Sequence, residues 1–297
     1  MSVHHRDMTA GATDTFVAHR NLLFTVAYEM TGSATDAEDV LQETWLRWAQ
    51  VDHDEVREPR AFLVRITTRL ALNRLRTVQR QRETYVGPWL PEPLLTTPDV
   101  AEDVELADSV SFAMLTVLET LLPAERAVFV LREVFDLPYD DIAAALDRST
   151  AAVRQLAHRA RSHVEARQPR IEVSVRERDA VVGRFLEAAT TGDFGSLLDL
   201  LAPDVVLVTD GGGKIRAALR PILGREKVLR FMQGVASPLL AAELRTVNGG
   251  PALCVLDDGE VHTIVNFLVE DGQVTGLYVV RNPEKLGRLA EPVTLAR

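Results

Sequence analysis

The sequence contains a single cysteine, Cys254, which excludes an internal disulfide and a metal cluster held by cysteines. It contains no apolar run long enough to cross a bilayer, and its start, MSVHHRDMTAGATD, lacks the apolar segment of a secretory signal. Histidines at the HExxH spacing of a zinc site are also missing. These absences predict a cytoplasmic protein with no disulfide, no cofactor, no metal and no membrane partner. The small, polar residues 1–13 are expected to be disordered.

Lysine is scarce, and its distribution is uneven. The three lysines, Lys214, Lys227 and Lys285, all lie in the last third of the chain, so arginine supplies nearly all the basic charge before them. The formal net charge is -10. A cluster of arginines within so acidic a chain indicates an anionic partner, because the planar guanidinium suits phosphate and guanine edges.

The stretch 35–82 combines an acidic helix with a basic one. In the first, the apolar positions leave Asp39, Gln42 and Glu43 together on another face. In the second, polar residues recur at steps of three or four and share one arc of the helix. These residues are Arg65, Arg69, Asn73, Arg76 and Arg80. Solvated faces are one interpretation, but solvated faces tend to mix charges of both signs, so the segregation favours docking surfaces.

A proline-rich, acidic segment follows at 83–108. Proline removes backbone donors and blocks helix, so this segment is predicted to be an extended linker. It carries Tyr85, Trp89 and several leucines, which is more apolar surface than a solvated spacer needs. We therefore expect it to dock on another part of the protein; the alternative is a flexible linker with incidental apolar residues.

Residues 109–170 predict helices that end in a helix-turn-helix. The sequence indicates a helix from Ser109 to Leu122, another over LPAERAVFVLREVF, and then two helices joined by a short turn, the last capped by Ser149 or Thr150. The packing stripe of the last helix leaves five positions exposed or flanking, where side chains can reach base edges or phosphate. They are Ala151, Arg154, Gln155, His158 and Arg159. A helical hairpin with a solvated basic face is the alternative.

From residue 171 the pattern changes to helices followed by strands with glycine-bearing turns, which predicts an α+β domain with a curved antiparallel sheet. KIRAALRPI (214–222) is expected to be one of its strands. Four side chains could approach a pocket in such a sheet, as a ligand site or as a catalytic group, although their spacing does not show that they converge. They are Asp210, His262, Asn266 and Tyr278.

Two short motifs stand out in this domain. DGGGK (210–214) lacks the glycine spacing and the Ser or Thr of a phosphate-binding loop, so a turn is its simplest interpretation. NPEKL (282–286) has the residues of a helix start.

The chain resembles a known family. DAEDVLQETWLRW followed by PRAFLVRITTRLALNRLR is similar to region 2 of extracytoplasmic-function sigma factors, the promoter-recognising subunits of bacterial RNA polymerase. LPAERAVFVLREVFDLPYDDIAAAL with VRQLAHRARSHV resembles region 4. The last part resembles the SnoaL-like branch of the cone-shaped domains related to nuclear transport factor two. YVGPWLPEP, DGGGK and NPEKL look like the signature of the SigJ-type subgroup, which joins these parts.

The resemblance implies a multidomain protein, with all-α domains at 1–82 and 109–170, the linker between them, and a cone-shaped α+β SnoaL-like domain at 171–297. It implies that Asp39, Gln42 and Glu43 bind core RNA polymerase. The arginine helix would bind the melted minus-ten element and the helix-turn-helix the minus-thirty-five element, with Asn73 departing from the acid that the family often has there.

The resemblance also implies that the C-terminal domain controls the sigma activity through contacts with the linker and the helical domains. The residues expected in these contacts are Tyr85, Trp89, Asp210, Gly211, Gly212, Gly213, Lys214, Asn282, Pro283, Glu284, Lys285 and Leu286. Promoter DNA and core polymerase are the expected partners, with a small molecule in the C-terminal pocket as a further candidate. A one-component regulator and a SnoaL-like enzyme fused to DNA-binding helices are alternative hypotheses, but neither accounts for the acidic strip.

Overall fold

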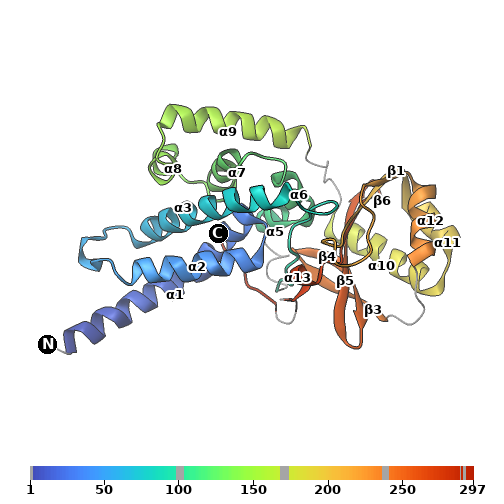
Figure 1. Cartoon of the computed structure of the whole chain (residues 1–297), viewed down its shortest axis with the longest axis horizontal. Helices are drawn as coiled ribbons and strands as arrows, with labels where there is room; N and C mark the ends of the chain where they lie inside the picture. Colours follow the sequence, from blue (N-terminus) through green and yellow to red (C-terminus); the bar gives the residue numbers. More distant parts are fainter. Residues whose placement is uncertain (1–2, 98–103, 168–173, 236–240, 288, 290–291) are drawn as a thin grey trace.

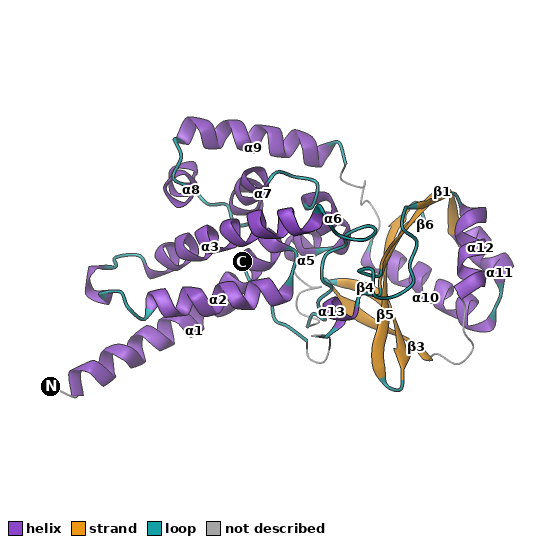
Figure 2. Ribbon diagram, viewed as in Figure 1, coloured by secondary structure: helices purple, strands orange, loops and turns teal. Residues whose placement is uncertain are grey.

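The computed structural model describes residues 3–97, 104–167, 174–235, 241–287, 289 and 292–297. A helical half and a sheet-containing half lie side by side along the long axis of the molecule (Figures 1 and 2). The helical half begins with α1 (Val3–Thr31), α2 (Ala34–Trp48), the short turn η1 (His53–Glu55) and α3 (Pro59–Arg82). Over the described residues, no helix is both long and apolar enough to cross a membrane.

The start of α1 corrects the prediction of disorder through residue 13, because the helix begins at Val3. Ala12 is buried, and its carbonyl accepts a hydrogen bond of 2.9 Å from the indole nitrogen of Trp48. Phe16 packs against Trp45 with ring centroids 5.2 Å apart. These contacts with α2 stabilise the part of the helix around residues 12–16, which its small polar residues would not stabilise alone.

The second group of helices carries the predicted helix-turn-helix. Its elements are α5 (Val104–Val110), α6 (Phe112–Leu118), α7 (Pro123–Phe129), the π-helical segment η2 (Val130–Val134), α8 (Tyr139–Leu146) and α9 (Thr150–Glu165). Asp147 ends α8 in the left-handed conformation, and Ser149 caps α9. The single helix expected from Ser109 to Leu122 is wrong: the chain breaks at Ser111, whose hydroxyl accepts from the Met114 amide and starts α6. Residues 98–103 of the predicted linker lie outside the described residues.

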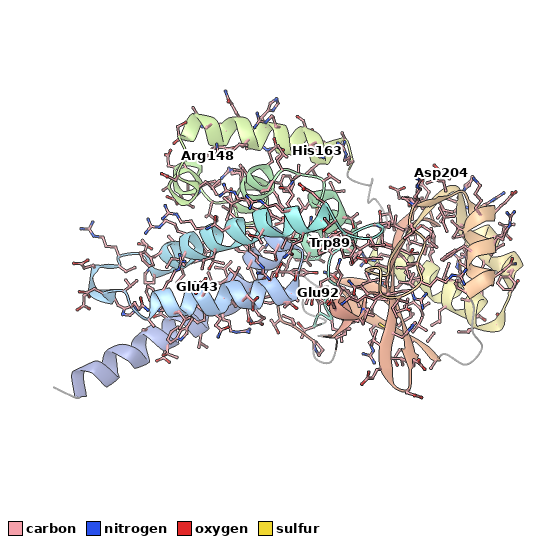
Figure 3. The ribbon with its side chains drawn as sticks, in the orientation of Figure 1. Glu43, Trp89, Glu92, Arg148, His163 and Asp204 are labelled. Atoms are coloured by element: carbon pink, nitrogen blue, oxygen red, sulfur yellow. The ribbon has the colours of Figure 1, made fainter. Side chains whose placement is uncertain are left out.

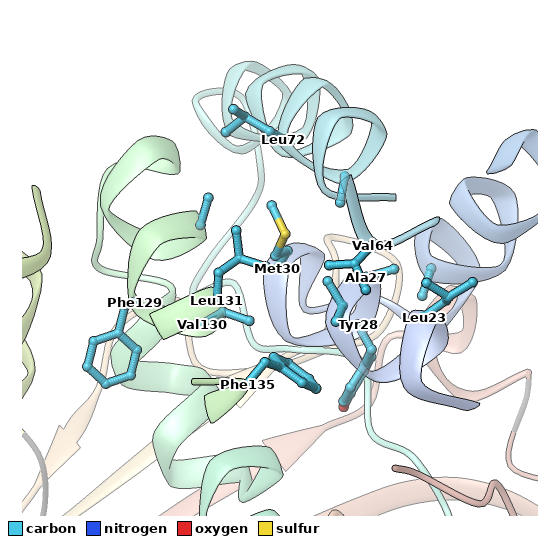
Figure 4. Close-up of a cluster of buried hydrophobic side chains, with 14 of the residues drawn as sticks. Leu23, Ala27, Tyr28, Met30, Val64, Leu72, Phe129, Val130, Leu131 and Phe135 are labelled. Carbon is cyan, nitrogen blue, oxygen red and sulfur yellow. The ribbon is translucent and has the colours of Figure 1, made fainter. Parts of the chain in front are cut away.

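The two groups of helices share one hydrophobic core. Met30 of α1 and Val64 of α3 belong to the same buried cluster as Leu131 and Phe135, which follow α7 (Figure 4). Gly32 lies so close to α6 that a Cβ atom there would come 2.2 Å from Glu119 Oε1. In this structure the two helical domains therefore pack as one body.

The sheet-containing half starts with two helices. Its elements are α10 (Val175–Thr191), α11 (Phe194–Leu200), β1 (Leu201–Asp210), β2 (Ile222–Leu223), α12 (Arg225–Val235), β3 (Ala241–Val247), β4 (Gly250–Asp257), β5 (Glu260–Glu270), β6 (Gln273–Val280) and α13 (Pro283–Leu286). The described strands form one sheet in the order β2-β1-β6-β5-β4-β3. Two helical domains followed by an α+β domain were predicted, and this arrangement is confirmed.

Two details of the sheet differ from the prediction. The pairing of β1 with β6 is parallel, whereas the other pairs are antiparallel. Only the end of KIRAALRPI is a strand, because the Thr209 hydroxyl bonds both backbone groups of Ala218 and holds this segment in an irregular loop.

The two faces of the sheet have different partners. One face, with Leu207, Phe267 and Leu277, packs on the helices α10, α11 and α12. The other face, with Cys254 and Ile264, packs on buried side chains that come from the linker and α6, namely Leu90, Leu95 and Phe112. The period-two alternation of the strands therefore places the linker on the second face.

Candidate functional site

The acidic strip lies on the solvent face of α2. Asp39 and Gln42 are exposed and Glu43 is half-exposed (Figure 3). Asp39 lies 3.7 Å from Arg74, and Glu43 forms a 3.0 Å ion pair with Arg47 one turn later. Such exposed pairs contribute little to stability, so the strip is free to serve a partner. Asp36, one turn before Asp39, is instead buried and bound to the same Arg74 at 2.6 Å.

The predicted DNA-binding residues of α3 are all exposed. Asn73 accepts a 3.4 Å hydrogen bond from Arg76. Arg69 differs from the others because its guanidinium donates to the carbonyls of Ala144 and Ala145 at 2.8 and 2.9 Å. These carbonyls end α8, so the first helix of the helix-turn-helix already occupies one of the arginines of α3 that were predicted to bind DNA.

The second helix of the helix-turn-helix, α9, presents all five predicted residues to solvent: Ala151, Arg154, Gln155, His158 and Arg159. Ser149 and Thr150 fix its start, the first by accepting from the Ala152 amide and the second by donating to Asp140. Arg154 lies over the Tyr139 ring at 5.7 Å, and Arg159 pairs with Glu125 at 3.0 Å. The turn before this helix lies at the outer edge of the helical half, at Arg148 in Figure 3.

A buried carboxylate joins the linker to the C-terminal domain. Asp210, at the end of β1, has no exposed surface. Its Oδ1 atom accepts from the Tyr85 hydroxyl at 2.5 Å and from the Gly212 amide at 3.1 Å. Its Oδ2 atom accepts from the Leu90 amide at 3.0 Å and from Lys285 Nζ at 2.8 Å. Burial and the neighbouring carboxylate raise the pKa of Tyr85, which keeps its proton for this bond.

Lys285 completes this site from α13. Its side chain is 8 % exposed, its ammonium also donates to the Leu90 carbonyl, and it lies 3.5 Å from the centre of the Trp89 ring. Arg82 also lies over this indole, at 4.7 Å, so Trp89 contacts cations from two domains. Burial lowers the pKa of Lys285, and the Asp210 carboxylate opposes that shift. We call Asp210, Lys285, Tyr85, Trp89 and Leu90 the linker clamp.

The glycines of DGGGK allow this close packing. A Cβ on Gly212, where φ is +62°, would lie 2.5 Å from the Asn282 side chain, and one on Gly213, where φ is +70°, would lie 3.0 Å from Val86. A Cβ on Gly211 would clash with the carbonyl oxygen of Ile215 across the turn. The motif therefore meets both NPEKL and the linker, which larger residues would prevent.

The remaining residues of the two motifs have distinct positions. Asn282 caps α13 by accepting from the Glu284 amide, and it donates to the Tyr85 hydroxyl at 2.9 Å. Pro283 opens that helix and is exposed, while Leu286 is buried. Lys214 and Glu284 pair with each other at the surface. Of the two lysines, Lys285 is the one that enters the clamp.

The candidate catalytic residues are not assembled into a site. Among the described residues, no side-chain hydrogen bond joins any two of Asp210, His262, Asn266 and Tyr278, although Asn266 and Tyr278 are paired across β5 and β6. Asp210 serves the linker clamp, and His262 contacts Thr263 and Arg281. Asn266 borders a cavity of about 40 Å³, room for a few water molecules at most. A larger cavity, of about 590 Å³, lies between the start of α3 and the start of α8.

Sequence reasoning missed the role of Glu92. This buried linker residue accepts from the Ser33 hydroxyl at 2.8 Å and from the Thr35 amide at 3.2 Å (Figure 3). Its own backbone accepts from the Tyr28 hydroxyl at 2.7 Å. The linker therefore binds the N-terminus of α2, where a carboxylate is favoured by the free amides. An acid between two prolines of an otherwise apolar segment was the available signal.

A buried ionic network between the helical domains was also missed. Arg126 of α7 is 1 % exposed; it donates to Glu119 at 2.8 Å and to the Glu29 carbonyl at 2.8 Å. Glu119 also pairs with Arg82, the residue that stacks on Trp89. Ionic contacts thus run from the linker clamp into the interface between α1, α3 and α7.

Comparison with known proteins identifies the family. The chain matches Sigma-70 region 2 over residues 15–81 and Sigma-70 region 4 over residues 111–164. It is 39% identical over 286 residues to the ECF RNA polymerase sigma factor SigJ of Mycobacterium tuberculosis, covering 91% of each chain. The chain belongs to the ECF RNA polymerase sigma factors. A probable ECF sigma factor of the same organism, SigI, is 31% identical over 279 residues, or 92% of this chain and 93% of the relative.

A solved structure supports the same assignment for this sigma factor. The crystal structure of M. tuberculosis SigJ matches with a TM-score of 0.76 and 36% identity, over 94% of this chain and 99% of that one. Region 2 therefore comprises α1 to α3, and region 4 comprises α6 to α9. As a sigma factor, the protein directs transcription initiation with core RNA polymerase, as the resemblance implied.

The interface between regions 2 and 4 contains a carboxyl group whose charge depends on pH. Burial raises the pKa of Glu29 from 4.5 to about 8, against the opposing effects of Ser109 and Arg126. The Ser109 oxygen lies 2.9 Å from both Glu29 Oε1 and the Leu106 carbonyl. One hydroxyl proton cannot fully serve two acceptors, so a protonated Glu29 that donates to Ser109 satisfies both contacts.

This group predicts a pH-dependent stability. The folded chain binds a proton that the unfolded chain releases, so the stabilisation is present below pH 4.5 and is lost as the pH rises to about 8. Relative to Glu29→Gln, the free energy of unfolding of the wild type should fall by up to about 1.4 kcal/mol per pH unit within this window. Denaturant titrations of both chains at several pH values measure this difference. Parallel pH profiles would show that Glu29 is ionised in the folded protein.

Proposed function

We propose that this sigma factor binds core polymerase through Asp39, Gln42 and Glu43, and that its C-terminal domain controls the separation of its two promoter-binding regions. The recognition helix α9 would contact base edges of the minus-thirty-five element. Arg65, Arg76 and Arg80 of α3 would bind the phosphates of the melted minus-ten element. The protein would act in the cytoplasm, beside the polymerase. We also propose that residues 82, 108 and 170 are the boundaries between region 2, the linker, region 4 and the C-terminal domain.

The closed arrangement of regions 2 and 4 supports control by domain separation. The two regions share a core, and Arg69 of α3 is bound to the end of α8. A phosphate group bound by Nε and Nη2 of Arg69 would compete with the α8 carbonyls for the same N–H groups, so bidentate phosphate binding at this position requires α8 to leave α3. A ligand that prefers the separated form would shift the population toward it.

The observation that carries the regulatory proposal is the linker clamp. Asp210 and Lys285 of the C-terminal domain hold both backbone groups of Leu90, which lies between regions 2 and 4. A linker held at Leu90 and at Glu92 cannot extend freely, so the distance that the two regions span is restricted. Release of the clamp would restore this freedom.

Promoter-directed transcription tests the assignment of the recognition helix. With sigma-free core polymerase and a promoter carrying both elements, the full chain should start transcripts at one site. Arg154→Ala and Gln155→Ala should change the preference among upstream-element variants, by about 1–3 kcal/mol for each lost bidentate base contact. His163→Ala, at the far end of the same helix, is the matched control. Equal weakening on every sequence would assign Arg154 and Gln155 to phosphate binding instead.

The alternative hypotheses have less support. A one-component regulator needs no acidic surface for core polymerase, and a fused enzyme needs polar groups that converge in a pocket. Asp210, the strongest catalytic candidate, is fully engaged with Tyr85, Leu90 and Lys285. A small-molecule ligand in the C-terminal pocket stays a prediction, to be tested by binding measurements on the full chain.

A further inference from the structure

The last residues of the chain return from the C-terminal domain to the helical half. The strands β5 and β6 lie in the sheet-containing half, whereas the C-terminal end lies over the helices (Figure 1). Contacts confirm this path, because the Ala296 amide donates to the Thr25 hydroxyl of α1 at 3.1 Å. We call residues 293–297 the tail.

The tail first pairs with the linker. The Val293 amide donates to the Leu95 carbonyl at 2.8 Å, and the Val293 carbonyl accepts from the Thr97 amide at 3.3 Å. On its other edge the linker pairs with β3, where the Thr96 amide donates to the Thr246 carbonyl at 3.1 Å. Residues 94–97 therefore form a short strand between β3 and the tail, an example of strand addition to a sheet edge.

The tail then inserts an anchor among the helices. Leu295 is 4 % exposed and belongs to the core shared by regions 2 and 4, unlike its exposed neighbour Thr294. Arg297 pairs with Glu105 of α5. An extended backbone with one buried leucine, bonded on both sides of it, is the arrangement of a peptide bound in a groove.

We propose that α1, α5 and the linker form a peptide-binding groove, for which the tail is the bound ligand within the same chain. The groove binds an extended segment with a leucine anchor, followed two residues later by a basic residue. Its walls are Thr25, Glu105 and the linker strand. The groove is separate from the linker clamp and uses neither DGGGK nor NPEKL.

Two attachments hold the C-terminal domain more firmly than either alone. When the clamp opens, the tail keeps the domain near the linker, so the clamp closes again as an intramolecular step at high effective concentration. When the tail leaves its groove, the closed clamp likewise keeps the tail near the groove, so the tail binds again as an intramolecular step. Loss of one attachment should therefore have a smaller effect on domain docking than loss of both, whether or not the docked domain controls transcription.

Amide hydrogen exchange in the full chain tests the groove. Leu295→Ala should raise the exchange rates of the Thr97 and Ala296 amides by on the order of thirtyfold, because the anchor that holds the tail is lost. The Asn282 amide, bonded to the Asp210 carbonyl at 3.0 Å, should keep its protection. Thr294→Ala is the matched control and should change neither site. Val293→Pro, which removes the donor to Leu95 while keeping Leu295 in place, should also expose Thr97.

Addition of a peptide then distinguishes a groove from a merely buried terminus. The peptide PVTLAR, the sequence of residues 292–297, should restore the protection of Thr97 in Leu295→Ala, and PVTAAR should not. The proposal is overturned if Leu295→Ala leaves Thr97 unchanged, if all amides lose protection equally, or if both peptides act alike.

Discussion

Lys285→Ala should detach the linker from the C-terminal domain and lower the free energy of unfolding by roughly 3–5 kcal/mol. The substitution leaves the carboxylate of Asp210 buried without its cation, and it removes a donor to the Leu90 carbonyl. The contact between the ammonium and the Trp89 ring is lost as well. Few single substitutions in this chain would remove so many contacts from one buried point.

Two measurements check this expectation. Denaturant unfolding of the full chain gives the stability change, and distances between labels at Arg47 and Arg161 report the separation of regions 2 and 4. The distance distribution of Lys285→Ala should broaden toward longer values. Lys214→Ala is the control, because its exposed pair with Glu284 contributes only about 0–1 kcal/mol.

A second comparison separates charge from packing at this site. Replacing both partners, as Asp210→Asn with Lys285→Met, removes the uncompensated charge and should be less destabilising than Lys285→Ala. If Lys285→Ala and wild type gave equal stabilities and equal distance distributions, the linker clamp would not restrain the two regions.

The double variant Asp39→Arg/Glu43→Arg should abolish co-purification with core RNA polymerase, a loss of at least about a hundredfold in affinity. The change reverses the charge of the exposed strip that we propose faces the polymerase. Both side chains lie off the packing face of α2, so the folded content should not change. Circular dichroism checks the fold, and pull-down with core polymerase checks the binding.

The control for this variant has the same change in net charge elsewhere. Glu187→Arg/Glu226→Arg also changes the net charge by four units, at exposed positions of α10 and α12. It should leave core binding intact. If both double variants bound core polymerase equally well, the acidic strip would be a solvated helix face with no role in binding. If both lost binding equally, the loss would be a general effect of net charge.

The linker clamp and the acidic strip of α2 are connected through the linker. Leu90 is held by the C-terminal domain, and Glu92, two residues later, is bound to Ser33 and Thr35 at the start of α2. That helix carries Asp39 and Glu43. The proposed binding of polymerase to α2 and the docking of the C-terminal domain would therefore act on the same few residues of the linker, which gives a physical route for coupling between them.

The sequence by itself determined the helical character of both sigma regions, the order of the domains and the residues on exposed faces. Helical spacing separated Asp39 from the packing side of α2, and it placed Arg154 and Gln155 on the outer side of α9, because these patterns depend on neighbours within one element. The sequence also singled out DGGGK, NPEKL and the apolar linker as segments that need a partner.

Only the tertiary structure decided which of these residues meet. Asp210 and Lys285 are 75 positions apart, and Leu90 lies 120 positions before Asp210, so no local pattern predicts that they share one buried site. The sequence does not show which of Lys214 and Lys285 is buried beside Asp210, since each lies in a motif with an acid nearby. The start of α1, the break at Ser111 and the burial of Leu295 likewise depend on packing between segments distant in the chain. Their stabilisation comes from surfaces that exist only after the domains have come together.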